Sequence, residues 1–216
     1  MKRDRLLNRL SNERAFKVGV SSRDLAALSL TEDLKVDILS TINSDDTADV
    51  QMGFFFAKHF LKPGQDLQFD QELLKRSLNL LETGERGTKD NCITMIVLLG
   101  RKLSNYRALM LNALQDSDPM VRQKAIQAYQ TYANPGEFGP LECFEHDGYV
   151  TEVGMGSHLI YELRNQALET IETVINIKFT KYEKTEVHKG NNVVFWWSWE
   201  PYHKWRNSIW HKLGLV

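Results

Sequence analysis

One stretch of the sequence decides the fold: Asp116-Ser117-Asp118-Pro119-Met120-Val121-Arg122-Gln123-Lys124-Ala125-Ile126-Gln127-Ala128-Tyr129. Asp118 can cap the first free N–H groups of a helix, and Pro119 follows where its missing N–H costs nothing. The apolar residues then recur at helical spacing and form one face: Val121, Ala125, Ile126 and Tyr129. Arg122 lies at the edge of that face, where it can pair with a carboxylate or a carbonyl group of the next unit. The stretch predicts a helix that needs a neighbouring helix to cover its apolar face.

The pattern Asp-Pro-x-Val-Arg-x-x-Ala at residues 118–125 resembles the beginning of the second helix of a HEAT repeat. One such helix pair cannot bury its own apolar face, so the resemblance implies further copies along the chain. One copy is Leu163-Arg164-Asn165-Gln166-Ala167, whose Arg164 lies 42 residues after Arg122. This spacing agrees with a repeat length of about 40–47 residues.

Two further copies lie upstream. In Ser44–Phe54, a capped turn precedes a helix with Gln51 in the Arg position, and a degenerate copy begins at Thr88-Lys89-Asp90. The sequence therefore predicts an all-α fold, an α-solenoid of about four HEAT-like helix pairs. We assign residues 1–30 to a basic N-terminal helical segment, 31–178 to the HEAT-like body and 179–216 to a Trp-rich cap.

The regular pattern ends before the body does. Glycines at 148, 154 and 156 indicate an inserted loop, after which a long helix is expected from Ser157 or His158 to about Lys178. Residues 181–187 and 193–197 then flank a turn and predict a hairpin, and a short helix is expected over 201–213. All five tryptophans lie in this last part. They either cap the open end of the stack or form an exposed binding surface.

Composition favours a globular protein, with 42% hydrophobic and 25% charged residues. The longest apolar runs, Gly53–Ala57 and Ile93–Leu99, are far shorter than the roughly 18 residues that a membrane span needs, so no membrane association is expected. The charged N-terminus has no apolar core of a secretion signal. Cys92 and Cys143 are too few for a disulfide framework. We expect a cytoplasmic protein with two reduced thiols.

The net charge of −1 is unevenly distributed. Residues 31–175 carry 13 Lys/Arg and 22 Asp/Glu, whereas residues 1–30 and 176–216 each have a net charge of +4. Nucleic-acid binding depends on clustered Lys and Arg, so the acidic body makes nucleic acid an unlikely partner. It favours a basic protein surface as the partner.

The motifs of common enzyme classes are missing from the sequence. It contains no phosphate-binding glycine loop, no Gly-x-Ser-x-Gly and no His-Glu-x-x-His. The densest group of possible metal ligands is Cys143 with Glu145-His146-Asp147, and adjacent side chains rarely converge on one ion. We therefore expect no catalytic residue, no metal and no cofactor.

These observations predict a non-enzymatic protein-binding module. Some HEAT-like proteins are toxin-neutralising immunity proteins or adaptors, so the resemblance implies a protein partner such as a basic toxin domain. The candidate partner-binding residues are Asp45, Asp46, Asp49, Asp116, Glu145, Trp196, Trp197 and Trp199. The alternative is a nucleic-acid-binding enzyme that resembles HEAT-like alkylpurine DNA glycosylases. It would require the basic residues near the C-terminus to bind phosphates: Lys178, Lys181, Lys184, Lys189, Lys204, Arg206 and Lys212.

Overall fold

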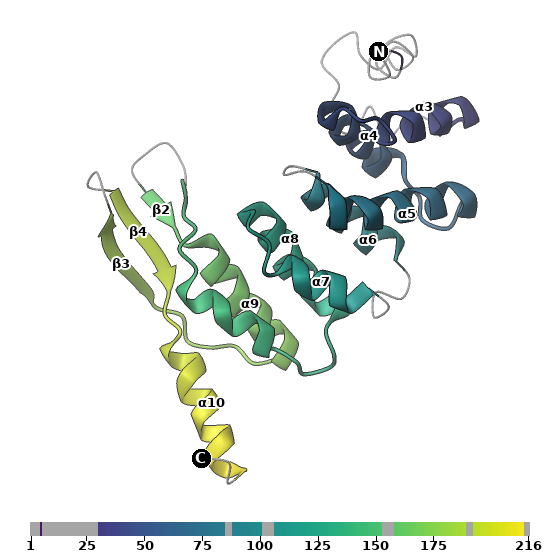
Figure 1. Cartoon of the computed structure of the whole chain (residues 1–216). Coiled ribbons are helices and arrows are strands. Elements are labelled where there is room, and N and C mark those ends of the chain that lie inside the picture. Colours follow the sequence, from purple (N-terminus) through teal and green to yellow (C-terminus); the bar gives the residue numbers. More distant parts are fainter. Residues whose placement is uncertain are drawn as a thin grey trace. The chain divides into compact units, whose positions relative to one another are not determined.

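The computed structural model describes Arg5 and residues 30–84, 88–100, 106–152, 158–188 and 192–213. Most of this part of the chain is helical, and one small sheet lies towards the C-terminus (Figure 1). The chain divides into two compact units, Met1–Leu109 and Met110–Val216, which we describe separately. The predicted N-terminal segment 1–30 lies outside the described residues except for Arg5 and Leu30.

The first unit contains two helix pairs. Helix α3 (Glu32–Ile42) packs against α4 (Thr47–Phe60), and α5 (Leu67–Thr83) packs against α6 (Lys89–Leu99). The pairs also contact one another, α3 with α5 and α4 with α6. Gly53 allows a close approach in the first pair, because a Cβ atom there would lie 2.5 Å from Cγ1 of Ile42. The core of this unit includes Leu34, Ile38, Phe54, Ala57, Leu73, Ile93 and Ile96.

The second unit combines helices with the sheet. Helix α7 (Arg107–Ala113) crosses the boundary between the units and leads to α8 (Pro119–Tyr132). A 3-10 helix η2 (Gly139–His146), helix α9 (Glu162–Ile175) and helix α10 (Glu200–Lys212) follow. Helix α9 packs against α8, η2 and the sheet. All four residues of the apolar face predicted from the opening stretch are fully buried: Val121, Ala125, Ile126 and Tyr129.

Helices occur at all four places where second helices were predicted, namely α4, α6, α8 and α9. The predicted start and end of the last one are wrong. Residues 158–160 form a strand, so the helix begins at Glu162, and it ends at Ile175, where Asn176 adopts a left-handed conformation with φ of 55°. A strand of three residues depends on a distant partner strand, which helical periodicity does not reveal.

The sheet has four strands, β1 (Thr151–Glu152), β2 (His158–Ile160), β3 (Glu183–His188) and β4 (Asn192–Trp197). Their order is β1-β2-β4-β3; β2 and β4 are parallel, and the other neighbours are antiparallel. The predicted hairpin is confirmed as β3 and β4, and the predicted C-terminal helix as α10. The strands β1 and β2 were not predicted. Because of them, the fold contains strands beyond the predicted hairpin and is not purely helical outside it. The sheet joins segments from both sides of the predicted boundary at residue 178.

Candidate protein-binding surface

The opening stretch forms the capped helix that its sequence predicts. Asp118 accepts a hydrogen bond from the backbone N–H of Met120 at 3.0 Å, and Pro119 occupies the first helical turn. Asp116, one of the predicted contact residues, is half-buried and accepts a bond from the N–H of Asp118 at 2.9 Å. Asp116 therefore helps to form the turn that precedes α8.

Two arginines of the repeat pattern meet at Asp147. Arg122 contacts the Asp147 carboxylate at 3.1 Å, and Arg164 donates from Nε to the Asp147 carbonyl oxygen at 2.7 Å. Arg122 also donates to the carbonyl oxygen of Asp116. The prediction that Arg122 pairs with a carboxylate or a carbonyl group is confirmed. These bonds hold together the starts of α8 and α9, which gives the two arginines a structural role.

Glu145 links η2 to α10. Its carboxylate lies 2.9 Å from Nε2 of His203. The neighbouring Glu142 accepts a bond from the Tyr202 hydroxyl and forms an ion pair with Arg206, whose Nε lies 3.1 Å from Oε1. Burial is the main cause that raises the pKa of the Tyr202 hydroxyl, and its bond to Glu142 adds to the effect. Glu145 is thus half-buried and paired within the protein.

The three predicted tryptophans pack mainly within the second unit. Trp199 is 4% exposed and lies edge-on to Tyr202, with ring centroids 5.6 Å apart. Trp196 is half-buried against Tyr161 at the same centroid distance, 5.6 Å. Trp197 is also half-buried, and its backbone N–H donates to Oδ1 of Asn165 at 2.8 Å. Of the three, Trp199 is buried, whereas Trp196 and Trp197 keep part of their surface accessible.

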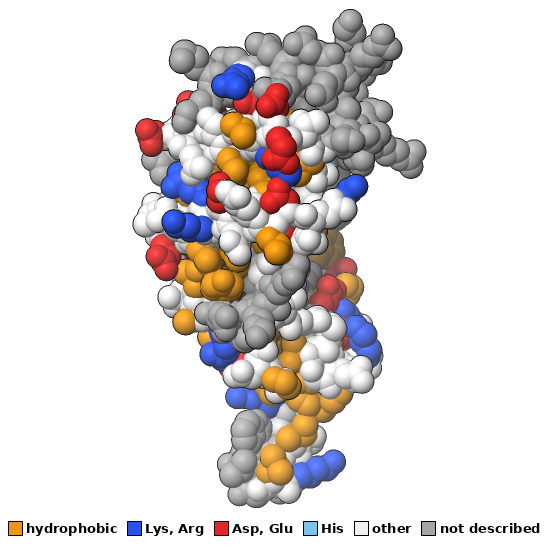
Figure 2. All heavy atoms as spheres, turned by 90° about the vertical axis from the view of Figure 1, so that its right-hand side faces the viewer, with side chains coloured by type: hydrophobic (Ala, Val, Ile, Leu, Met, Phe, Trp, Pro, Cys, Tyr) orange, Lys and Arg blue, Asp and Glu red, His pale blue; other side chains and the backbone are white. Residues whose placement is uncertain are grey.

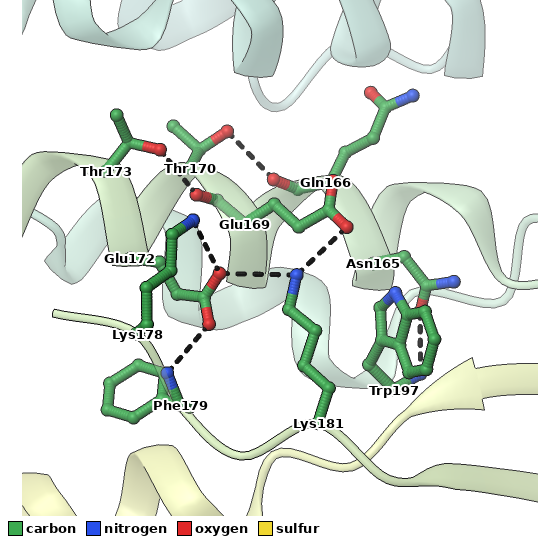
Figure 3. A network of polar contacts seen from close by, with 10 residues as sticks. All are labelled: Asn165, Gln166, Glu169, Thr170, Glu172, Thr173, Lys178, Phe179, Lys181 and Trp197. Atoms are coloured by element: carbon green, nitrogen blue, oxygen red, sulfur yellow. Dashed lines mark hydrogen bonds and ion pairs between the residues drawn. The ribbon is translucent and has the colours of Figure 1, made fainter.

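Several C-terminal lysines are paired with carboxylates. Glu172 on α9 is 1% exposed, and Figure 3 shows Lys178 and Lys181 converging on it. The same carboxylate accepts a bond from the N–H of Phe179 at 2.9 Å, and Lys181 also reaches Glu169 at 3.1 Å. The network fixes the chain between α9 and the sheet, because a buried carboxylate needs such partners.

The three predicted carboxylates of the first unit differ in exposure. Asp46 caps α4 and accepts bonds from the N–H groups of Ala48 and Asp49 at 2.8 and 3.3 Å. Asp49 is 8% exposed and accepts a bond from the Ser44 hydroxyl at 3.0 Å, so it lies within the fold. Asp45 is exposed and has no hydrogen bond or ion pair with any described residue. Of the three, Asp45 and Asp46 lie at the surface.

Phe55 is the surface residue that the sequence analysis missed. Three successive phenylalanines suggest a helix buried on much of its circumference, yet Phe54 and Phe56 are 1% and 2% exposed and Phe55 is 50% exposed. Its ring lies edge-on to the ring of His59, with centroids 4.5 Å apart. Because successive residues are about 100° apart on a helix, Phe55 points away from the buried Val50, Gly53 and Ala57, a position that the helical period alone would have given.

We define the α4 outer face as six residues of this helix and the turn before it, each of them exposed or half-exposed: Asp45, Asp46, Gln51, Phe55, Lys58 and His59. Counted from the caps Asp46 and Asp118, Arg122 corresponds to the buried Val50, so the prediction that Gln51 occupies the Arg position is wrong by one residue. Helix α4 therefore has no equivalent of the bond between Arg122 and Asp147.

Charge does not single out one patch on the face drawn in Figure 2. Figure 2 shows acidic, basic and apolar side chains interspersed over the face that it draws. Within the residues that the structure describes, no group of three or more His, Cys, Asp or Glu side chains is placed to hold a metal ion. None of the described helices combines the length and apolar character needed to span a membrane.

Comparison with known proteins gives no further assignment. No protein-family model, no curated protein and no solved structure matches this chain.

Proposed function

We propose that this chain is a non-enzymatic protein-binding module of HEAT-like helix pairs, and that the α4 outer face binds a basic protein. Its resemblance to HEAT repeats extends the proposal to an α-solenoid that acts as an adaptor or as an immunity protein against a basic toxin domain. The observation that carries the proposal is the 50% exposure of Phe55 on a helix whose neighbouring phenylalanines are buried.

Phe55 has the properties of an interface anchor. Aromatic side chains contribute much of the binding energy in protein interfaces, particularly where they are held in one position before the partner arrives. Contact with His59, at 4.5 Å between ring centroids, limits the motion of the Phe55 ring. A partner that covers this ring would bury apolar area without first ordering a flexible side chain.

The charge at the N-terminal end of the α4 outer face supports a basic partner. Asp45 and Asp46 lie at the N-terminal end of α4, and the carboxylate of Asp45 has no counter-ion among the described residues. Lysine or arginine side chains of a partner could pair with these groups. Such pairs speed association and fix the orientation of binding more than they add affinity.

The alternative of a nucleic-acid enzyme gains no support from the described residues. It requires the basic residues near the C-terminus to bind phosphates, yet four of them are paired with carboxylates: Lys178, Lys181, Lys184 and Arg206. Of the candidates for stacking on a base, Trp199 is 4% exposed, and Trp196 and Trp197 are half-buried. We therefore retain the protein-binding function alone.

A photo-crosslinking experiment tests the proposal. Phe55 is replaced by p-benzoylphenylalanine in the native source, with the same replacement at exposed Lys75 on α5 as the control. We expect one protein of high isoelectric point to be crosslinked from position 55 and not from position 75. Equal crosslinking from both positions, or no protein at all, would argue against a partner on the α4 outer face.

The acidic residues are tested with the partner in purified form. The double substitution Asp45→Asn and Asp46→Asn removes two charges but keeps an asparagine at the cap, where it serves almost as well as aspartate. Association should slow by roughly tenfold at low salt, and the difference should shrink as salt rises. Retention of the wild-type chain on heparin at about 150 mM salt would instead favour nucleic acid.

A further inference from the structure

Strand β3 lies at the edge of the sheet, and among the described residues it pairs with β4 alone (Figure 1). The direction of its backbone groups follows from one bond. Ser198 donates from its N–H to the carbonyl oxygen of Tyr182 at 3.0 Å, in the same register as the pairs Glu183–Trp197 and Thr185–Phe195. In an antiparallel ladder, every second residue directs its backbone N–H and C=O groups towards the partner strand. Residues 182, 184 and 186 therefore face β4, and the N–H and C=O groups of residues 183, 185 and 187 point outwards.

The side chains along this edge are accessible. Glu183, Thr185 and Val187 are exposed, and Val187 has the highest exposure among the large apolar side chains of the described residues, at 76%. Lys184 and Glu186 point to the other face, where Lys184 contacts Glu200 at 3.0 Å and Glu186 accepts a bond from the Tyr161 hydroxyl. An edge strand with outward-facing backbone groups is a template for another strand.

Among the registers centred on residues 184, 185 and 186, the charge pattern of β3 is complementary to itself in one. Antiparallel pairing of two copies must place outward residues opposite outward residues, so the two-fold axis passes through a residue. An axis through residue 184 puts two lysines opposite each other, and an axis through residue 186 puts two glutamates opposite each other. An axis through Thr185 places each Lys184 opposite Glu186 of the second copy. This pair is of the non-hydrogen-bonded type, in which facing side chains come closest.

We infer that β3 pairs antiparallel with β3 of a second copy of this chain, centred on Thr185, so that the two four-stranded sheets become continuous. The contact would cover Val187 and satisfy the outward backbone groups of residues 183, 185 and 187. It concerns the second unit and does not depend on the function proposed for α4.

A charge-swap series tests both the contact and its register. Lys184→Glu would place two glutamates opposite each other at two points of the interface, and Glu186→Lys would do the same with lysines. Each should weaken dimerisation by about tenfold or more, because directly opposed like charges destabilise paired strands. The double variant restores opposite charges and should return the dimerisation constant to within about threefold of wild type. Sedimentation equilibrium measures the constants, with Lys75→Glu as the control.

The double variant separates the interface from the fold. The contacts of Lys184 with Glu200 and of Glu186 with Tyr161 are lost in the double variant as well as in the single ones, so recovery of the dimer can only come from the second copy. A wild-type chain that is monomeric at about 100 μM overturns the inference. Single variants that dimerise like wild type, or a double variant that does not recover, also overturn it.

Crosslinking provides a second measurement if a charge variant does not fold. Thr185→Cys, combined with Cys143→Ser to remove the exposed natural thiol, places two cysteines across the axis. The facing Cα atoms of a hydrogen-bonded pair are about 5.5 Å apart, within disulfide reach. We expect a covalent dimer from Thr185→Cys and none from Glu82→Cys, an exposed position on α5. Equal dimer from both positions would contradict the pairing.

Discussion

Helices α4 and α8 have the same length and begin in the same way, but they differ in what they expose. Each has 14 residues and follows an aspartate cap, Asp46 or Asp118. At the fourth helical position α8 has Arg122, bonded to Asp147, whereas α4 has the buried Val50. At the ninth position α8 exposes the polar Gln127 and α4 exposes Phe55.

The difference separates structural residues from candidate binding residues. The helical period decides which positions are exposed, and it exposes the ninth position in both helices. An exposed glutamine is the ordinary outcome at such a position, and we propose that the exposed Phe55, whose ring contacts His59, serves binding. Conversely, Arg122 of α8 contacts Asp147 in the following segment. The next four predictions test this separation, beginning with the largest effect.

Phe54 and Phe55 should differ most in their effect on stability. Phe54→Ala removes a buried ring and should lower the free energy of unfolding by about 3–5 kcal/mol. Phe55→Ala should lower it by less than about 1 kcal/mol, because half of the side chain already contacts water. Urea denaturation of both variants provides the measurement. A loss at Phe55 as large as that at Phe54 would mean that the exposed ring has a structural role.

Removing the contact between Arg122 and Asp147 should have the second-largest effect on the free energy of unfolding. Asp147→Asn removes the charge that Arg122 contacts at 3.1 Å, where the two side chains are 14% and 17% exposed. We expect a loss of about 1–3 kcal/mol in the free energy of unfolding, the range for hydrogen bonds to charged groups. Asp45→Asn, at an exposed and unpaired carboxylate, should change it by less than about 0.5 kcal/mol. Equal effects of Asp147→Asn and Asp45→Asn would contradict the distinction between a carboxylate paired within the fold and an unpaired carboxylate at the surface.

The two neighbouring aspartates before α4 should differ by a smaller amount. Asp46→Ala removes the bonds to the N–H groups of Ala48 and Asp49, and loss of such a cap costs about 1 kcal/mol. Asp45→Ala should cost less than about 0.5 kcal/mol. Thermal unfolding of the two variants compares them directly. The assignment of Asp46 as the cap fails if Asp45→Ala is the more destabilising change.

The ion pair between Lys35 and Asp66 gives the smallest effect, and we state its direction alone. The bond to Lys35 holds the pKa of the Asp66 carboxyl group below its ordinary value. A lowered pKa contributes stability above the ordinary carboxyl value of about 3.9, and this contribution is lost as the pH falls through the lowered pKa. Asp66→Asn keeps a residue that can cap α5, so its difference from wild type should shrink between about pH 5 and pH 2. A difference that grows on acidification would be contrary to this assignment.

The features that could be predicted from sequence are those set by neighbours in the chain. Asp118, Pro119 and the apolar spacing specify the start of α8 within a few residues, and the hairpin signals around residues 189–192 are equally local. The strands β1 and β2 could not be predicted, because β2 pairs with β4 more than 30 residues away in the sequence. When a short segment does not alternate between apolar and polar residues, its sequence does not indicate that it pairs with a distant strand.

The candidate binding residues were predicted less well than the fold, for the same physical reason. Composition identifies Asp49 and Trp199 as polar or aromatic, but whether they face water depends on which elements cover them. Asp49 bonds to Ser44 and Trp199 packs on Tyr202, and both are buried. Phe55 could have been found, since the positions of Val50, Gly53 and Ala57 fix the buried side of α4.

The most direct test of the α4 outer face is a titration of the crosslinked partner, in purified form, with wild type and with Phe55→Gln. This substitution gives α4 the residue type that α8 has at the same position and leaves the core unchanged. We predict a dissociation constant at least about tenfold higher for Phe55→Gln, equivalent to about 1.4 kcal/mol, and a change of less than about twofold for Lys75→Gln. Equal affinity of Phe55→Gln and wild type would contradict a binding role for the α4 outer face.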